Sequence, residues 1–211
     1  MTSAGAPEAP AEQANAAWAA VPIPLPTQQL HGFLADIERL LRLNPHLEIA
    51  AWLDESDAPE ARRYRLRALN EGNGCRIDVL VKIEALGESA GYLLEYDRGL
   101  KRSTELRIAP ADGGSLLTIT EQYHPVPDET DERLKEVDRS LVPWTAAIRR
   151  HLIGMTRFGR WPGYRWWTER FMPGMAPRQR RIVRMIVWVS LLEFIVFLFV
   201  ALIFWLESRP S

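Results

Sequence analysis

The chain has 211 residues, one cysteine and a formal net charge of −1 at pH 7. This length suffices for one globular domain with its own core, and a single cysteine excludes a scaffold of internal disulfides. Residues 1–148 hold 15 Lys/Arg against 24 Asp/Glu, a net charge of −9, which argues against a nucleic-acid-binding surface in this part of the chain.

The N-terminal part of the chain begins with a segment that has no hydrophobic periodicity. Residues 1–17 are rich in Ala, Pro and Glu and have no basic region followed by an apolar one, so we predict disorder and no signal peptide. Residues 18–25 can form a short strand, which two prolines confine to a sheet edge. Apolar spacing then predicts a helix over about 28–43, capped by Thr27.

Six further strands are expected before residue 125. Apolar and polar side chains alternate most clearly over 75–86, where four Ile and Val residues share one face. Turn signals, such as Glu-Gly-Asn-Gly at 71–74, separate the alternating stretches. The predicted strands are His46–Leu53, Arg63–Leu69, Cys75–Leu86, Gly91–Asp97, Lys101–Ile108 and Ser115–His124.

A long helix follows the strands. Its apolar residues recur every three or four positions from Leu134 to Met155, so they form one stripe that must pack against the sheet. Asp128 or Thr130 is expected to cap this helix, and Pro143 is expected to bend it.

This order of elements resembles the helix-grip fold of the START/Bet v 1-like superfamily, also called SRPBCC, which includes polyketide cyclase/dehydrase-like members. The resemblance covers residues 18–155 and includes the stretch Gly-Gly-Ser-Leu-Leu-Thr-Ile-Thr-Glu-Gln-Tyr-His-Pro at 113–125, which looks like the last strand of such domains. It implies an α+β fold in which a curved antiparallel sheet packs on a long C-terminal helix. It also implies a cavity between them that holds a lipid or other hydrophobic small molecule.

Alternation along the strands and the helical stripe provide candidates for the cavity wall. Glu121 is the one acidic group among them: it either forms a structural ion pair with Arg65, Arg67 or Arg107, which we favour, or acts as a general acid or base. The candidates are Tyr92, Tyr96, Ile119, Glu121, Tyr123, Leu141, Trp144 and Ile148.

No catalytic motif is present, and Cys75 has no partner that a motif would supply. The four histidines lack the spacing of metal ligands, so we expect no metal and no cofactor. Enzymatic activity stays open, with a preference for none.

The C-terminal part combines a basic, aromatic segment with an apolar one. Residues 149–184 contain ten Arg and one Glu, and Trp and Tyr alternate with these arginines over 157–171. We therefore expect residues 156–181 to form a juxtamembrane collar that contacts lipid headgroups, rather than single-stranded nucleic acid. Its expected interface residues are Arg160, Trp161, Arg165, Trp166, Trp167, Arg178, Arg180 and Arg181.

Residues 182–206 are predicted to form one transmembrane helix, because the 24 residues from Ile182 to Trp205 are almost all apolar. The arginines that precede this segment place the large domain in the cytoplasm, with the tail 207–211 across the membrane. Glu193 lies near mid-span, where an ionisable group usually contacts a partner helix, although a protonated Glu in lipid is the alternative.

Three functions are consistent with this sequence. We rank first a membrane-tethered binding module for a lipid or other hydrophobic ligand. An assembly or scaffolding subunit of a membrane complex comes second, because of Glu193. A cyclase- or dehydrase-like enzyme that acts on a hydrophobic substrate comes third.

Overall fold

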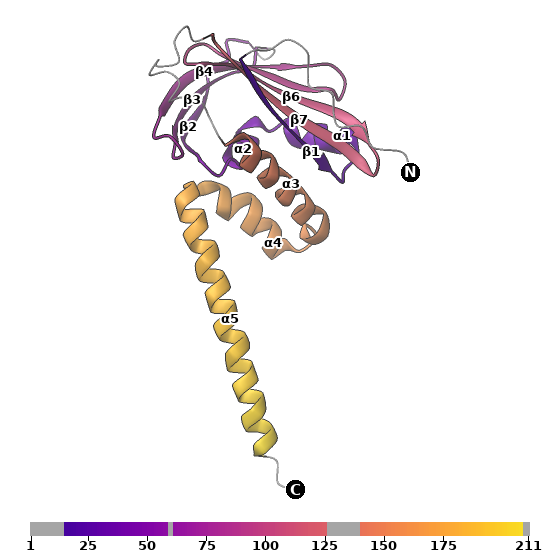
Figure 1. Ribbon diagram of the computed structural model, residues 1–211, viewed down its shortest axis with the longest axis vertical. Coiled ribbons are helices and arrows are strands. Elements are labelled where there is room, and N and C mark those ends of the chain that lie inside the picture. The colour runs from indigo at the N-terminus through magenta and orange to yellow at the C-terminus, as the bar shows by residue number, and fades with distance from the viewer. Residues whose placement is uncertain (1–14, 59–60, 126–139, 209–211) are drawn as a thin grey trace.

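Figure 1 shows a computed structural model of the chain, which describes residues 15–58, 61–125 and 140–208. Seven antiparallel strands form one curved sheet with the spatial order β1-β7-β6-β5-β4-β3-β2. The six strands expected between 46 and 124 are present, and the proline-containing first strand lies at an edge as expected. The strands are β1 (Ala16–Ile23), β2 (Leu47–Asp54), β3 (Arg63–Asn70), β4 (Arg76–Ala85), β5 (Gly91–Tyr96), β6 (Lys101–Ala111) and β7 (Gly114–Tyr123).

The alternation in the sequence determines which face of the sheet is buried. In β4, Val79, Val81 and Ile83 are buried on the concave face, while Lys82 and Glu84 face solvent. At the start of β5, Gly91 has φ +129°, and a Cβ there would lie 1.8 Å from the carbonyl oxygen of Leu106. Only glycine allows β5 and β6 to approach so closely.

Two short helices cover the concave face where one was predicted: α1 (Thr27–Leu34) and α2 (Ile37–Arg42). The single helix was wrong because Asp36 starts a new one, with its carboxylate accepting a hydrogen bond from the backbone N–H of Arg39 at 3.0 Å. The predicted Thr27 cap was also wrong: Thr27 is the first helical residue, and no side chain caps α1.

The long helix α3 (Leu141–Phe158) packs against the concave side of the sheet near β1. The predicted caps Asp128 and Thr130 lie outside the described residues. Pro143 does not bend α3, because it stands in the first turn, where backbone N–H groups have no helical acceptor. The Trp144 indole N–H donates to the carbonyl of Leu40 at 2.9 Å, which joins α3 to α2.

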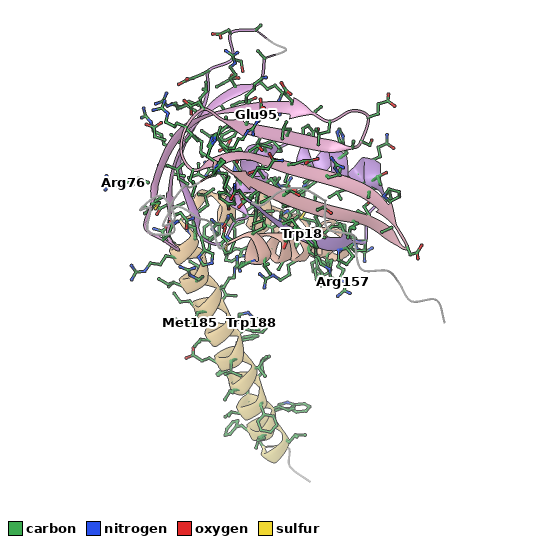
Figure 2. All side chains as sticks on the ribbon, turned by 45° about the horizontal axis from the view of Figure 1, so that its top comes forward. Trp18, Arg76, Glu95, Arg157, Met185 and Trp188 are labelled. Carbon is green, nitrogen blue, oxygen red and sulfur yellow. The ribbon has the colours of Figure 1, made fainter. Side chains whose placement is uncertain are left out.

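Four further helical segments follow α3: α4 (Pro162–Trp166), the π-helix η2 (Trp167–Phe171), the 3₁₀ helix η3 (Met172–Gly174) and α5 (Pro177–Glu207). Figure 1 shows that the chain turns back below α2 and α3 before α5 projects away from the sheet. Over Pro177–Leu206, α5 is long and apolar enough to cross a membrane, and none of its most apolar stretch is buried. In Figure 2, Met185 and Trp188 lie on the part of α5 that projects from the domain, and they are 61% and 70% exposed.

Candidate functional site: a cavity between the sheet and two helices

A cavity of about 380 Å³ lies between the concave face of β3–β7 and the helices α2 and α3. The turns that follow β3 and β5 border it at one end of the sheet, through Asn73, Cys75, Arg98 and Gly99. These turns lie together because antiparallel neighbours bring the end of β5 next to the start of β4.

Most of the wall is apolar. The strands contribute Leu66, Ile77 and Val79, while Leu41 and Trp144 cover them from the helices. Hydrogen bonds fix the position of the covering helices, since the Asn44 amide donates to the Ser140 hydroxyl at 2.7 Å, in addition to the Trp144 bond. The shape of the cavity therefore depends on how α2 and α3 are joined.

One part of the wall is polar and centres on Glu121, whose side chain is 1% exposed. The Lys101 ammonium donates to one carboxylate oxygen at 2.5 Å, and the Tyr123 hydroxyl donates to the other at 2.6 Å. Next to this group, the hydroxyls of Tyr96 and Thr104 are 3.1 Å apart. A molecule in the cavity would thus meet apolar side chains and this buried polar cluster, with further polar side chains at Asn70, Asn73, Arg76, Asp78 and Arg98.

The ion pair of Glu121 was expected, but its partner was not. Arg65 and Arg67 lie near Asp78 instead, and Arg107 pairs with Glu105, all outside the buried face. Lys101 reaches Glu121 because the pairing of β6 with β7 shifts by one residue between Lys101 and Ser103. No sequence motif indicates this irregularity, which is why Lys101 was missed.

The other predicted cavity residues divide into two groups. Tyr96 and Trp144 line the cavity together with Glu121, and Tyr123 contributes through its bond to Glu121. The remaining candidates are buried in the core but are not among the lining residues: Tyr92, Ile119, Leu141 and Ile148. Sequence periodicity identified the buried face correctly, but it could not distinguish packed core from cavity wall.

Among the described residues, no group of three or more His, Cys, Asp or Glu side chains could hold a metal ion. Cys75 borders the cavity and is partly buried. Both carboxylate oxygens of Glu121 already accept hydrogen bonds, one from Lys101 and one from Tyr123.

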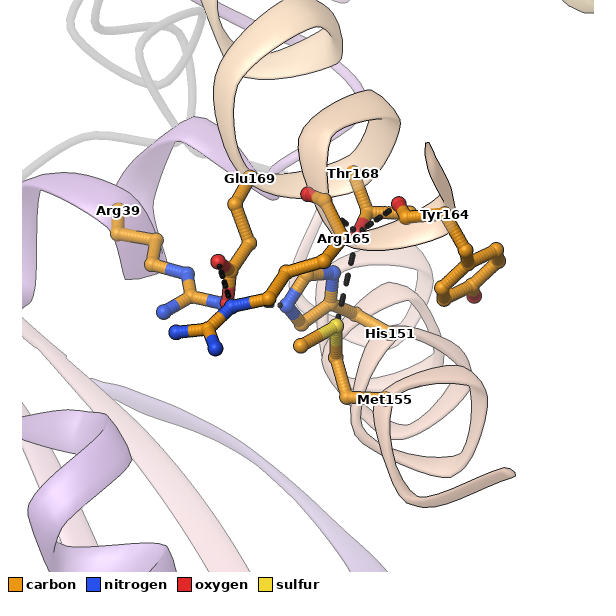
Figure 3. A network of polar contacts seen from close by, with 7 residues as sticks. All are labelled: Arg39, His151, Met155, Tyr164, Arg165, Thr168 and Glu169. Carbon is orange, nitrogen blue, oxygen red and sulfur yellow. Dashed lines mark hydrogen bonds and ion pairs between the residues drawn. The ribbon is translucent and has the colours of Figure 1, made fainter. Parts of the chain in front are cut away.

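A second polar cluster joins the collar to the domain (Figure 3). Arg39 of α2 donates to Glu169 of η2 at 3.1 Å and lies 3.0 Å from the Nε2 of His151 in α3, while Arg165 bonds Glu169 at 2.8 Å. Burial, together with the charge of Arg39, lowers the pKa of His151 to about 4. Burial would raise the pKa of Glu169, but the hydrogen bonds and charges of Arg165 and Arg39 outweigh it and lower that pKa.

The predicted membrane-interface residues are only partly at the surface. Trp161 and Trp166 are 64% and 54% exposed, and Arg160, Arg165 and Arg178 are exposed as well. Trp167 is half-buried and stacks on Phe171, with ring centroids 4.9 Å apart.

Two arginines at the start of α5 contact the domain. Arg181 pairs with Glu71 at 2.8 Å, so part of its charge is already neutralised. Arg180 is only 7% exposed and donates to the carbonyl of Arg42 at 2.5 Å. The buried guanidinium of Arg180 is therefore not at the protein surface, where the sequence had placed it.

Comparison with known proteins identifies the fold. No protein-family model and no curated protein sequence matches the chain. A START superfamily protein from Mycobacterium smegmatis matches with a TM-score of 0.51 and 15% identity, over 67% of this chain and 99% of that one. Ara h 8.0201 (21% identity, 66% and 97% of the two chains, TM-score 0.42) and a protein from Deinococcus radiodurans (18%, 66% and 98%, 0.47) are more distant in shape. The chain thus has the START/Bet v 1-like helix-grip fold that the order of its elements predicted.

Proposed function

We propose that this START/Bet v 1-like chain is a membrane-tethered module that binds a lipid or other hydrophobic small molecule in the cavity between its sheet and its helices. The observation that supports this most directly is the cavity itself. Its volume of about 380 Å³ falls within the range of small-molecule sites, which are mostly apolar with a few convergent polar groups.

The lining suggests how a ligand would be oriented. The apolar part of a ligand would displace water from Leu66, Ile77 and Val79, and removing this apolar surface from water favours binding. A polar end would lie near the cluster formed by Glu121 and Lys101, which remains hydrogen-bonded when the cavity is empty. This arrangement favours a molecule with one polar end over a pure hydrocarbon.

The tether is supported by the surface of α5. A core helix of comparable hydropathy would be mostly covered by protein, whereas the most apolar stretch of α5 is 0% buried. In water such a surface would aggregate, and a bilayer is the environment that removes it from water. The arginines from Arg178 to Arg184 favour a cytoplasmic domain, with the exposed Trp161 and Trp166 at the headgroup level.

The proposal is tested with the full-length protein purified in mild detergent, followed by mass spectrometry of the small molecules that remain bound. We expect wild type to retain a hydrophobic ligand and Val79→Phe to lose it, because the added ring volume occupies the cavity that Val79 lines. Val142→Phe is the matched control, since Val142 is 67% exposed on α3. Equal retention by both folded variants would refute ligand binding in this cavity.

Glu193 supports the second function, a scaffolding role. Its side chain is exposed in the middle of the apolar surface of α5, where an unpaired carboxylate is costly. A partner helix would shield it. The enzyme hypothesis has less support, and it predicts loss of the physiological activity in both Glu121→Gln and Tyr96→Phe.

A further inference from the structure

A second, smaller pocket of about 180 Å³ lies between the start of β2 and the base of α5. Its lining includes Arg42, Glu48, Gln179 and Arg180, together with the chain at 174–176 that leads into α5. Leu47, Ile49 and Met175 also line this pocket, but the surface open to a bound molecule is mainly polar, so it suits a small charged group.

Arg180 is the unusual member of this pocket. It is only 7% exposed, yet its guanidinium makes a single hydrogen bond within the described residues, from Nη1 to the carbonyl of Arg42, and its buried Nε has no partner there. The neighbouring cations are paired, since Arg42 bonds Glu38 at 2.8 Å and Arg181 bonds Glu71 at 2.8 Å. Glu48 lines the same pocket and the charge of Glu71 acts on Arg180, but neither forms an ion pair with the guanidinium, so a buried donor is left without an acceptor among the described residues.

The surrounding backbone adds to this positive potential. The pocket lies beside the N-terminal end of α5, a helix of 31 residues, where backbone N–H groups carry partial positive charge. The charge of the exposed Arg184 also acts on Arg180. Among the described lining residues, Glu48 is the one acid, beside the two cations Arg42 and Arg180.

We infer that this pocket binds a phosphate-type anion, with the guanidinium of Arg180 as its central donor. The position of the pocket, immediately before the proposed membrane span, makes the headgroup of an anionic phospholipid the expected source. That source rests on the proposed tether, whereas the anion site itself rests on the geometry of Arg180. Inorganic phosphate offers the same chemistry without a membrane.

The experiment uses native mass spectrometry of full-length protein released from detergent micelles that contain either phosphatidylglycerol or phosphatidylcholine. We expect wild type to retain one phosphatidylglycerol and no phosphatidylcholine. Arg180→Gln should weaken retention about tenfold or more, the effect of losing one charge-assisted hydrogen bond. Glu48→Gln should strengthen retention, because it removes the acid from the lining.

Arg184→Gln is the matched control, since it removes the same charge from an exposed position outside the pocket. Equal weakening by Arg184→Gln and Arg180→Gln, with no effect of Glu48→Gln, would show only diffuse attraction and overturn the site. In a second arm without lipid, inorganic phosphate at constant ionic strength should raise the Tm of wild type more than that of Arg180→Gln.

The two arms also separate this inference from the proposed function. A rise in Tm with inorganic phosphate, without retention of phosphatidylglycerol, would support the anion site and indicate that its anion comes from solution and not from a lipid headgroup. No response to either probe means that only water occupies the pocket, and this overturns the inference. Ligand binding in the large cavity is measured separately from both arms. The comparison of wild type with Val79→Phe therefore tests the proposed function whether or not the smaller pocket binds an anion.

Discussion

Removing the ammonium of Lys101 is the sharpest test of the polar cluster in the cavity. In Lys101→Met, the carboxylate of Glu121 would keep its bond from Tyr123 but lose its positive partner, while its side chain remains 1% exposed. We expect a destabilisation of about 3 kcal/mol, at the low end of the cost of breaking a buried ion pair, because Lys101 itself is 26% exposed. For a domain of this size that corresponds to a fall in Tm of roughly 10 °C.

A double-mutant cycle separates this pair from every other contact of Lys101. Glu121→Gln alone should cost about 1 kcal/mol, because the amide can still accept a hydrogen bond from Tyr123. The double variant Lys101→Met/Glu121→Gln should then be more stable than Lys101→Met, with a coupling energy of about 2 kcal/mol.

The assay is thermal unfolding of the full-length protein in mild detergent, followed by near-UV circular dichroism at pH 7. A coupling energy near zero would refute the view that Lys101 compensates a buried charge.

Three further predictions test other parts of the fold. The folded-state pKa of His151 is about 4, below its unfolded value of 6.5. The stability that comes from keeping this buried imidazole neutral is therefore fully present above pH 6.5, and ~3 kcal/mol of it should be lost as the pH falls to 4. In urea titrations at several pH values, His151→Gln should reduce this dependence of the unfolding free energy on pH. Gly91→Ala should prevent folding or cost at least ~3 kcal/mol of stability. Gly32→Ala in α1 should instead stabilise the protein by ~0.5–1 kcal/mol, because no atom lies within 4 Å of an added Cβ there. Similar melting curves for the two variants would contradict the geometry at Gly91. Glu193→Leu should reduce the proteins that co-purify in mild detergent, and an unchanged set counts against a partner helix.

Local patterns in the sequence predicted most of the sheet, because period-two alternation directly reflects a sheet with one buried face. The inward position of Glu121 followed from the same rule. The break between α1 and α2 did not, since apolar spacing continues across Asp36 and only the cap itself ends one helix and starts the next. The predicted bend at Pro143 was wrong, because α3 begins only two residues before it and a proline in the first turn does not disrupt a helix.

Contacts between distant segments were beyond sequence reasoning. Lys101 meets Glu121 through a register shift between two strands. Arg39, His151 and Glu169 meet only after three helical segments have packed together. The arginines in the first two turns of α5 all looked alike in sequence, yet packing buries Arg180 and leaves Arg184 exposed. Such differences depend on tertiary geometry, which no periodicity encodes.

The connection into α5 also limits how far the domain can travel. Only Met175 and Ala176 lie outside helical structure between η3 and α5, and two residues span at most ~7 Å. Arg181 and the backbone N–H of Arg178 both bond Glu71, in the turn that adjoins the cavity residues Asn70 and Asn73. If α5 spans a bilayer as proposed, a domain attached in this way could not carry a ligand to a second membrane. Its exchange with other molecules would then take place close to the surface of that bilayer.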